Sequence, residues 1–252
     1  MTWAVVTGAS GGLGRAYARY LASCGLSVVL TGRRDAELRA LASELTSKWG
    51  TTTLVRRYDL AEASDRAALL GDLDGLDVDT LVNNAGFGML GPVRDADAAR
   101  LSSMVTLNCV ALTELTRAVL PGMVERGSGS IVNVASTAAF QPIPTMAAYA
   151  ASKAYVLRFT EALWAEVSGT GVRAVAICPG PTDTAFFEAA GNDSVMKKRR
   201  TPEQVVQATF AALRANRPAV VDGPANALLA ATARFVPTRL GLRIARFVVS
   251  QG

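Results

Sequence analysis

A tyrosine and a lysine four residues apart form the pair in this sequence best suited to acid–base chemistry. Tyr149 and Lys153 lie in an alanine-rich stretch of helical character, so their side chains project from one face of a helix. A nearby ammonium stabilises a phenolate and brings the phenol pKa, ordinarily about 10, toward neutral pH. The same spacing also arises by chance in many helices. The chain contains no histidine, which excludes imidazole catalysis and histidine-ligated zinc, so this pair is the candidate acid and base.

Two polar residues elsewhere in the chain are candidates to join this pair. Ser136 ends the apolar run IVNVAS, where its hydroxyl bonds either a substrate carbonyl or the end of its own strand. Asn108 lies inside the helical apolar pattern of MVTLNCVALTEL, where its helix propensity is low and a buried amide needs a hydrogen-bond partner. A structural role explains each residue as well as a catalytic role does.

A glycine-rich segment follows the first apolar run and leads directly into a helical pattern. It reads TGASGGLG, and the spacing of Gly8, Gly12 and Gly14 differs from the G-x-G-x-x-G of the common Rossmann fingerprint. Glycines let the backbone approach a ligand closely, and the free N–H groups of a helix N-terminus attract phosphate. We therefore expect a dinucleotide pyrophosphate at this turn, the alternative being a tight turn that binds nothing.

Two arginines at the end of the second apolar run bear on the choice of cofactor. A site specific for NAD normally carries an acidic residue there, which binds the ribose 2′-hydroxyl. This chain has Arg33 and Arg34 after Gly32, and guanidinium groups bind a 2′-phosphate instead. The pattern favours NADP(H), unless the two arginines are simply solvated at the start of a helix.

The elements that must position these residues alternate along the chain. Short runs rich in β-branched residues predict strands, which cover residues 3–8, 26–32, 51–60, 79–86, 129–136, 172–180 and 218–223. Helical periodicity covers residues 13–23, 36–49, 65–70, 98–126 and 149–167. This alternation indicates an α/β, doubly wound Rossmann fold, a single domain with a parallel sheet of about seven strands. Its ligand site should lie beyond the carboxyl ends of the strands, where the strand order switches.

Several ordered motifs together resemble the classical short-chain dehydrogenase/reductase family. They span residues 2 to 190 and are the turn from Thr7 to Gly14, Asp59 after a strand, the run Asn83-Asn84-Ala85-Gly86, Asn108, Ser136, Tyr149 with Lys153, and Pro179-Gly180. The resemblance implies that Ser136 polarises a substrate carbonyl and that Tyr149 exchanges the proton. It also implies that Lys153 holds the nicotinamide ribose and lowers the tyrosine pKa, and that Asn108 positions a water for proton relay.

The same resemblance implies a cofactor site spread over several loops. The residues expected to bind the cofactor are Gly8, Ser10, Gly12, Leu13, Gly14, Arg33, Arg34, Asp59, Leu60, Asn83, Ala85, Gly86, Tyr149, Lys153, Pro179, Gly180, Thr182 and Thr184. Within this set, Asp59 would contact adenine. Asn83, Ala85 and Gly86 would support the adenine ribose and the central strand. Thr182 and Thr184 would meet the nicotinamide carboxamide.

The activity that the resemblance implies is hydride transfer between NADP(H) and a ketone or secondary alcohol. One departure is that NADP-preferring members often carry a basic residue where this chain has Gly11, so the preference rests mostly on Arg33. We expect residues 87–90, 140–146 and 186–200, the last as a lid, to select a small apolar substrate, although their apolar side chains can also simply pack. The sequence fixes neither the substrate nor the direction. The alternatives are a non-catalytic NADP-sensing protein and a membrane-associated scaffold of the same fold.

Positive charge is concentrated at the end of the chain. The net charge is +5, and residues 197–252 hold 10 basic and 2 acidic side chains. Because no zinc knuckle or aromatic-interleaved basic run accompanies them, we expect no nucleic-acid partner. Residues 226–252 form a basic amphipathic extension, for which packing on the core or on a second subunit is favoured over binding to an anionic membrane.

Composition bounds the remaining properties. Half of the residues are hydrophobic, which is ample for a globular core. The three cysteines, Cys24, Cys109 and Cys178, are far apart, so we expect free thiols, no disulfide framework and no metal site. No apolar run of 18 residues is present, and no basic residue precedes Arg15. We therefore expect a cytoplasmic protein, as a homodimer or homotetramer.

Overall fold

The computed structural model describes residues 1–183, 199–233, 236–237, 239 and 241–243. Within these residues, one parallel sheet contains seven strands in the order β3-β2-β1-β4-β5-β6-β7. The strands are β1 (Thr2–Thr7), β2 (Ser27–Gly32), β3 (Thr53–Arg57), β4 (Asp77–Asn83), β5 (Gly129–Val134), β6 (Val172–Cys178) and β7 (Ala219–Val221). The prediction of a single α/β domain with a seven-stranded parallel sheet is confirmed.

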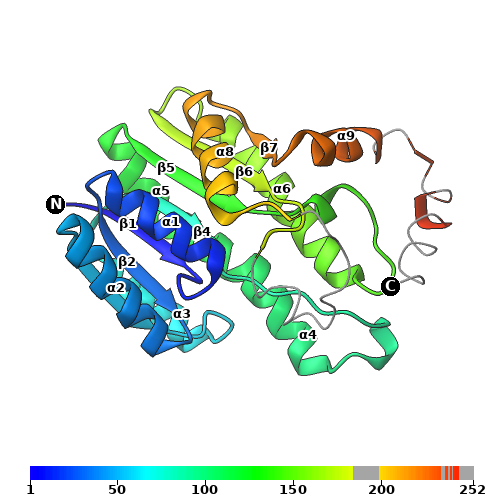
Figure 1. Cartoon of the computed structure of the whole chain (residues 1–252), viewed down its shortest axis with the longest axis horizontal. Coiled ribbons are helices and arrows are strands. Elements are labelled where there is room, and N and C mark those ends of the chain that lie inside the picture. The colour runs from blue at the N-terminus through cyan, green and yellow to red at the C-terminus, as the bar shows by residue number, and fades with distance from the viewer. Residues whose placement is uncertain (184–198, 234–235, 238, 240, 244–252) are drawn as a thin grey trace.

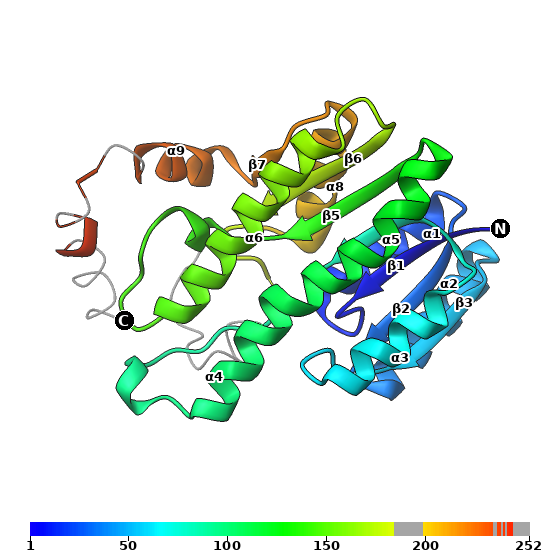
Figure 2. The ribbon, with the colours of Figure 1, turned by 180° about the vertical axis from the view of Figure 1, so that it is seen from behind.

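Helices cover both faces of this sheet, as Figure 1 and Figure 2 show from opposite sides. One face carries α1 (Gly12–Ser23), α2 (Asp35–Trp49) and α8 (Pro202–Arg214), and the other carries α3 (Ala63–Leu73), α5 (Leu112–Arg126) and α6 (Ala147–Glu166). Beyond the carboxyl ends of the strands lie the short turns η1 (Val93–Asp95) and η3 (Thr137–Phe140) and the helices α4 (Ala98–Val105) and α9 (Pro224–Ala233).

Alternate residues of the central strands supply two separate cores. On β1, Ala4 and Val6 pack under α1, α2 and α8, whereas Val5 packs with Val29 of β2 under α3 and α5. All four side chains are fully buried. Because both faces of a doubly wound sheet are covered, its strands are apolar throughout, which is why continuous apolar runs predicted them correctly.

The direction in which the chain crosses the sheet reverses at β1. The chain first adds β2 and β3 on one side of β1, then returns to place β4 on the other side and continues outward to β7. Crossovers that leave adjacent strands in opposite directions open a crevice beyond the carboxyl ends of those strands. The glycine-rich turn follows β1 and the run from Asn84 to Gly86 follows β4, so both motifs line this crevice.

Two helical predictions were wrong in detail. Residues 98–126, predicted as one helix, contain α4, a π-helical segment η2 (Thr106–Ala111) and α5. The helix α8 was not predicted, although Thr201 and Gln204 form a capping box with Pro202 at the first helical position, which is a start pattern that the sequence displays. In the part of the chain that the structure describes, no helix combines the length and the apolar character needed to cross a membrane. Most of the expected lid at 186–200, and much of the extension at 226–252 after α9, lie outside the described residues.

Candidate active site

The tyrosine, lysine and serine singled out from the sequence meet beyond the end of β5. Tyr149 and Lys153 lie one turn apart on α6 and are buried, with 7% and 5% of their surfaces exposed. The Tyr149 hydroxyl is hydrogen-bonded to Ser136, which lies two residues after β5. The Nζ atom of Lys153 donates to the carbonyl oxygen of Val134 at 2.8 Å and lies 5.9 Å from the centre of the Tyr149 ring.

Ser136 has the capping role that its sequence position allowed and also faces the tyrosine. Its Oγ accepts a hydrogen bond from the N–H of Ala138 at 3.1 Å and so caps the turn η3. The same side chain bonds Tyr149. A residue at the end of a central strand is thereby fixed in orientation by its own backbone while its hydroxyl faces the tyrosine.

Burial controls the protonation of the tyrosine and the lysine. It raises the pKa of Tyr149 to about 12, and the hydrogen bond to Ser136 opposes only part of this rise. It lowers the pKa of Lys153 to about 8. The expectation that Lys153 brings the tyrosine pKa down toward neutrality is wrong for this structure. Desolvation of the phenolate dominates, and the ammonium is hydrogen-bonded to Val134 rather than to the phenol.

Asn108 lies on the π-helical segment and links the loop after β4 to α6. Its Nδ2 donates to the carbonyl oxygen of Phe87 at 3.1 Å and to Ser152 Oγ at 3.0 Å, and its Oδ1 accepts the N–H of Phe87 at 3.2 Å. Ser152 Oγ in turn donates to the carbonyl oxygen of Tyr149 at 2.7 Å. The amide therefore has the structural partners that its burial requires, and these connect it to the tyrosine. A Cβ at Gly86 would lie 2.8 Å from Asn108 Oδ1, so this approach requires a residue without a side chain.

The glycine turn (Thr7–Gly14) joins β1 to α1 in a conformation that needs glycine at two positions. Gly8 has a φ of +64°, in the left-handed region. A Cβ on Gly14 would strike the carbonyl oxygen of Gly8 and would lie 2.9 Å from the Cα of Ala9. Leu13 packs its side chain against the core under α1. The first N–H groups of α1 therefore lie at the crevice, where the glycines leave the backbone uncovered by side chains. This arrangement suits a pyrophosphate.

Asn84, which was named in a sequence motif without an assigned role, braces this turn. Its Nδ2 donates to the carbonyl oxygens of Thr7 at 2.9 Å and Gly8 at 3.3 Å. The Oγ1 of Thr7 accepts the N–H groups of Asn84 and Ala85, each at 2.9 Å. The second asparagine of the Asn83-Asn84 pair thus ties the end of β4 to the start of the glycine turn.

Asn83, which the sequence did single out, points into the layer between the sheet and α5. Its Nδ2 donates to Thr116 Oγ1 at 3.1 Å and to Asn133 Oδ1 at 2.9 Å. The Nδ2 of Asn133 then donates to Thr160 Oγ1 at 2.9 Å on α6. Asn83 therefore supports the central strands, which is one of the two roles expected of it.

The two arginines after β2 stand in different environments. Arg34 is held against the glycine turn, because its Nη2 donates to the carbonyl oxygen of Ser10 at 2.6 Å and its Nε to Ser10 Oγ at 3.4 Å. The Arg33 side chain is 65% exposed, and its Nη1 lies 3.5 Å from Asp59 Oδ2 at the end of β3. Leu60, the next residue, is buried in the core. Of the two arginines, Arg33 is the more exposed and has the fewer side-chain bonds.

The segment after β6 closes the opposite side of the site. The carbonyl oxygen of Pro179 accepts the N–H of Thr137 at 2.9 Å, which places this segment beside η3. Thr182 is buried, and its Oγ1 donates to the carbonyl oxygen of Gly180 at 3.1 Å. Thr184 lies outside the described residues.

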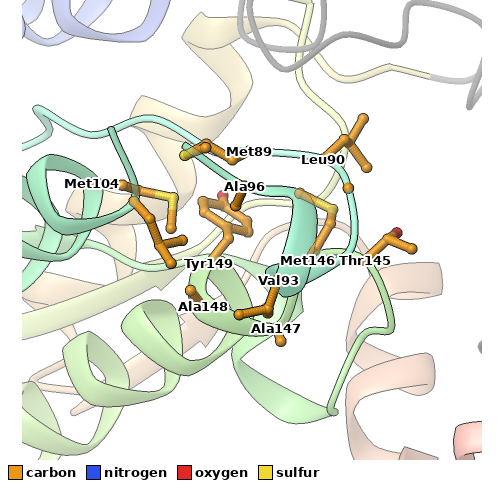
Figure 3. A pocket seen from close by; sticks show the side chains of 12 residues that line it. Met89, Leu90, Val93, Ala96, Met104, Thr145, Met146, Ala147, Ala148 and Tyr149 are labelled. Carbon is orange, nitrogen blue, oxygen red and sulfur yellow. The ribbon is translucent and has the colours of Figure 1, made fainter. Parts of the chain in front are cut away.

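A small pocket, lined mostly by apolar residues, adjoins Tyr149. Figure 3 shows the Tyr149 ring among the side chains of Met89, Met104 and Met146. The loops 87–90 and 140–146, expected to select the substrate, contribute Met89 and Met146. Met104 on α4 and Val93 on η1 also line the pocket and were not predicted. In the part of the chain that the structure describes, no group of three or more Cys, Asp or Glu side chains is arranged to hold a metal ion.

Comparison with known proteins gives consistent matches. The chain is 36% identical over 217 residues to a very-long-chain 3-oxoacyl-CoA reductase of Anas platyrhynchos, a match that covers 82% of this chain and 67% of that protein. It is 41% identical over 189 residues to sulfoacetaldehyde reductase 2 of Chromohalobacter salexigens, covering 72% of this chain and 73% of the relative. Among solved structures, a short-chain dehydrogenase from Sphingobium yanoikuyae in complex with NADPH superposes with a TM-score of 0.85 and 31% identity, over 93% of this chain and 95% of that one.

A family model described as short chain dehydrogenase matches residues 2–194. The matched stretch includes the glycine turn, the asparagine pair after β4, and the Ser136, Tyr149 and Lys153 side chains that meet at the end of β5. The resemblance seen in the sequence is confirmed, and the chain belongs to the short-chain dehydrogenase family.

Proposed function

We propose that this protein is an NADP(H)-dependent oxidoreductase that interconverts an apolar ketone and the corresponding secondary alcohol, with Tyr149 as the proton donor and acceptor. The observation that carries the proposal is the buried Tyr149–Ser136 hydrogen bond at the edge of the apolar pocket. Two relatives are named as reductases of an oxoacyl-CoA and of an aldehyde, and a structural neighbour holds NADPH, which supports carbonyl reduction with this cofactor.

The residues around the crevice fit a nicotinamide dinucleotide. The glycine turn leaves backbone N–H groups bare at the start of α1 for the pyrophosphate, since Gly14 has no room for a side chain. Arg33 is exposed beside the end of β2, where a ribose 2′-phosphate would bind it. Lys153 would hold the nicotinamide ribose, and Thr182 would meet the carboxamide. When bound, the nicotinamide supplies or accepts the hydride at the substrate carbon.

The side chains on α6 and β5 would handle the substrate oxygen and its proton. In reduction, Ser136 and Tyr149 donate hydrogen bonds to the carbonyl oxygen, and Tyr149 gives it a proton as negative charge develops. The raised pKa of Tyr149, about 12, keeps the phenol protonated and ready to donate at neutral pH. In oxidation the phenolate accepts the alcohol proton, and Lys153, which is charged below its pKa of about 8, stabilises that anion from one helix turn away.

The proposal is tested with purified protein, NADPH and a panel of ketones that range from apolar to charged, followed by nicotinamide absorbance. We expect turnover of apolar ketones and a fall in kcat of about a hundred- to ten-thousandfold in Tyr149→Phe, because proton transfer is lost. Tyr155→Phe is the matched control, since Tyr155 lies on the same helix and its hydroxyl bonds Thr113 at 2.8 Å. Turnover in Tyr149→Phe equal to that of the control would refute the assignment of the acid and base.

A further inference from the structure

The helix α9 exposes large apolar side chains to solvent. Its ten residues, PANALLAATA, include no charged side chain. Leu228 and Leu229 are 67% and 68% exposed, and of the α9 residues whose side chains are described only Ala230 is buried. Water in contact with two adjacent leucines on a helix is unfavourable, so a surface of this kind usually meets a partner.

The chain around α9 is strongly basic. From residue 224 to residue 252 the sequence contains four arginines and neither aspartate nor glutamate. Of these arginines, Arg239 and Arg243 lie in the described part of the chain and are exposed. The apolar Val236, before Arg239, and Leu242, before Arg243, are exposed as well. Exposed apolar and cationic side chains thus alternate along one segment, which suits a surface that offers both hydrocarbon and negative charge.

The first turn of α9 is anchored beside the candidate active site. Asn226 Nδ2 donates to the carbonyl oxygen of Asp222 at 2.8 Å, and a Cβ on Gly180 would strike the Asn226 side chain. The helix also contacts η3, the turn that follows Ser136. In Figure 1 and Figure 2, α9 and the loop before α4 both lie beyond the carboxyl ends of the strands, on opposite sides of that end of the molecule. Leu90 and Val93, in the segment before α4, line the pocket and are exposed.

The chemistry of α9 favours a lipid surface over a protein partner. Its two polar side chains are engaged within the chain, Asn226 with Asp222 and Thr232 with the carbonyl oxygen of Leu229 at 3.0 Å. A second copy that paired this segment with itself would bring its own arginines near Arg239 and Arg243, and like charges across an interface are unfavourable. A lipid surface needs no directional hydrogen bonds from α9 and offers negative charge to the arginines.

We propose that α9, through the exposed Leu228 and Leu229, docks the protein on an anionic lipid membrane, with the exposed Val236, Arg239, Leu242 and Arg243 of the segment after it as further contacts. The leucines enter the boundary between headgroups and acyl chains, and the arginines face the lipid phosphates. Because α9 contacts η3, the turn that follows Ser136, docking would also bring this side of the candidate active site toward the membrane. If the proposed function holds, an apolar ketone dissolved in the bilayer would then have a short path to Tyr149.

The test is co-sedimentation of the 252-residue protein with vesicles of phosphatidylcholine, alone or mixed with phosphatidylglycerol, at low salt. We expect sedimentation with the mixed vesicles, reduced by salt, and weak sedimentation with phosphatidylcholine alone. Leu228→Asp and Leu229→Asp should each lower the partition coefficient by about tenfold or more, because a leucine is withdrawn from the lipid and replaced by a negative charge. Val124→Asp is the matched control. Val124 is an exposed apolar residue at the end of α5, two residues from Arg126, which pairs with Asp77 at the amino end of β4.

Four outcomes would overturn the proposal. They are background sedimentation of the parent protein with anionic vesicles, equal binding to both kinds of vesicle, equal loss in Leu229→Asp and Val124→Asp, and a parent dimer that Leu229→Asp converts to monomers without any vesicle binding. The last result would show that a second copy covers α9. Thermal unfolding of each variant establishes that it is folded. The assay requires no turnover, so its result is independent of the proposed oxidoreductase activity.

Discussion

Replacing Arg33 with alanine tests whether this residue determines the proposed preference for NADPH over NADH. Arg33 follows Gly32 at the end of β2, and Gly32 itself supplies no carboxylate to bind a free ribose hydroxyl. The Arg33 guanidinium is largely exposed and has a long ion pair to Asp59 at 3.5 Å. Arg33→Ala should therefore weaken NADPH binding and leave NADH binding almost unchanged.

The size of this effect is the free energy of the bond from Arg33 to the 2′-phosphate less that of the ion pair with Asp59. A charge-assisted hydrogen bond to the 2′-phosphate contributes about 1.5–3 kcal/mol, and an exposed ion pair such as the one with Asp59 contributes about 0.2–1 kcal/mol. The net gain of about 1–2 kcal/mol for one bond corresponds to about 5- to 30-fold in affinity. A bidentate contact would raise the effect to about a hundredfold.

The assay is the ratio of the dissociation constants for NADPH and NADH, together with kcat/KM for each. Arg39→Ala removes the same charge from α2, where Arg39 pairs with Asp35 at 2.6 Å, and should leave the ratio unchanged. Arg34→Ala should have a smaller effect than Arg33→Ala, because the Arg34 guanidinium is already bonded to Ser10. Similar kcat/KM values for NADH and NADPH in the parent, or an equal loss of both cofactors in Arg33→Ala, would refute the reasoning.

Three further predictions concern the glycine turn and α6. Gly14→Ala should lower Tm and abolish NADPH binding by titration, because its Cβ meets the Gly8 carbonyl oxygen and such overpacking costs about 1–3 kcal/mol; unchanged binding would contradict this. Alcohol oxidation should rise with pH above neutrality, as the fraction of Tyr149 phenolate increases toward its pKa of about 12, whereas a flat oxidation profile would remove Tyr149 as the base. Between the Lys153 pKa of about 8 and its ordinary value of 10.5, only the unfolded chain keeps the lysine proton, so the urea unfolding free energy should rise with pH relative to Lys153→Met. A parallel pH dependence of parent and variant would contradict it.

The strands and the glycine turn were predictable because local composition alone specifies them. A strand covered on both faces, such as β2, must be apolar at successive positions, and a turn like the one after Gly8 needs glycine whatever surrounds it. The π-helical segment was not predictable in the same way. Asn108 follows a normal helical pattern in the sequence, and the change in helix geometry accompanies its bonds to Phe87 and Ser152, which come from distant parts of the chain.

The two adjacent asparagines show where sequence reasoning reached its limit. Adjacent residues at the end of β4 point in different directions, so one of them had to face the sheet interior and the other the crevice. Which of them faces Thr7 depends on β4 lying next to β1, and strand order is not written in either strand. Asn83 bonds Asn133 in the interior, and Asn84 is the residue that bonds the glycine turn.

The Tyr149–Lys153 pair separates what spacing determines from what burial determines. Four-residue spacing correctly placed both side chains on one face of α6. It gave the wrong sign for the tyrosine pKa, because that sign depends on how much water surrounds the phenol and on which acceptor takes the lysine ammonium. Once Val134 holds the ammonium and the ring is buried, the resting phenol is a protonated donor. On the proposed function, Tyr149 is then a proton donor to a carbonyl oxygen, whereas the reverse reaction would first form a buried phenolate. The Ser136 hydroxyl and the Lys153 ammonium would stabilise that anion.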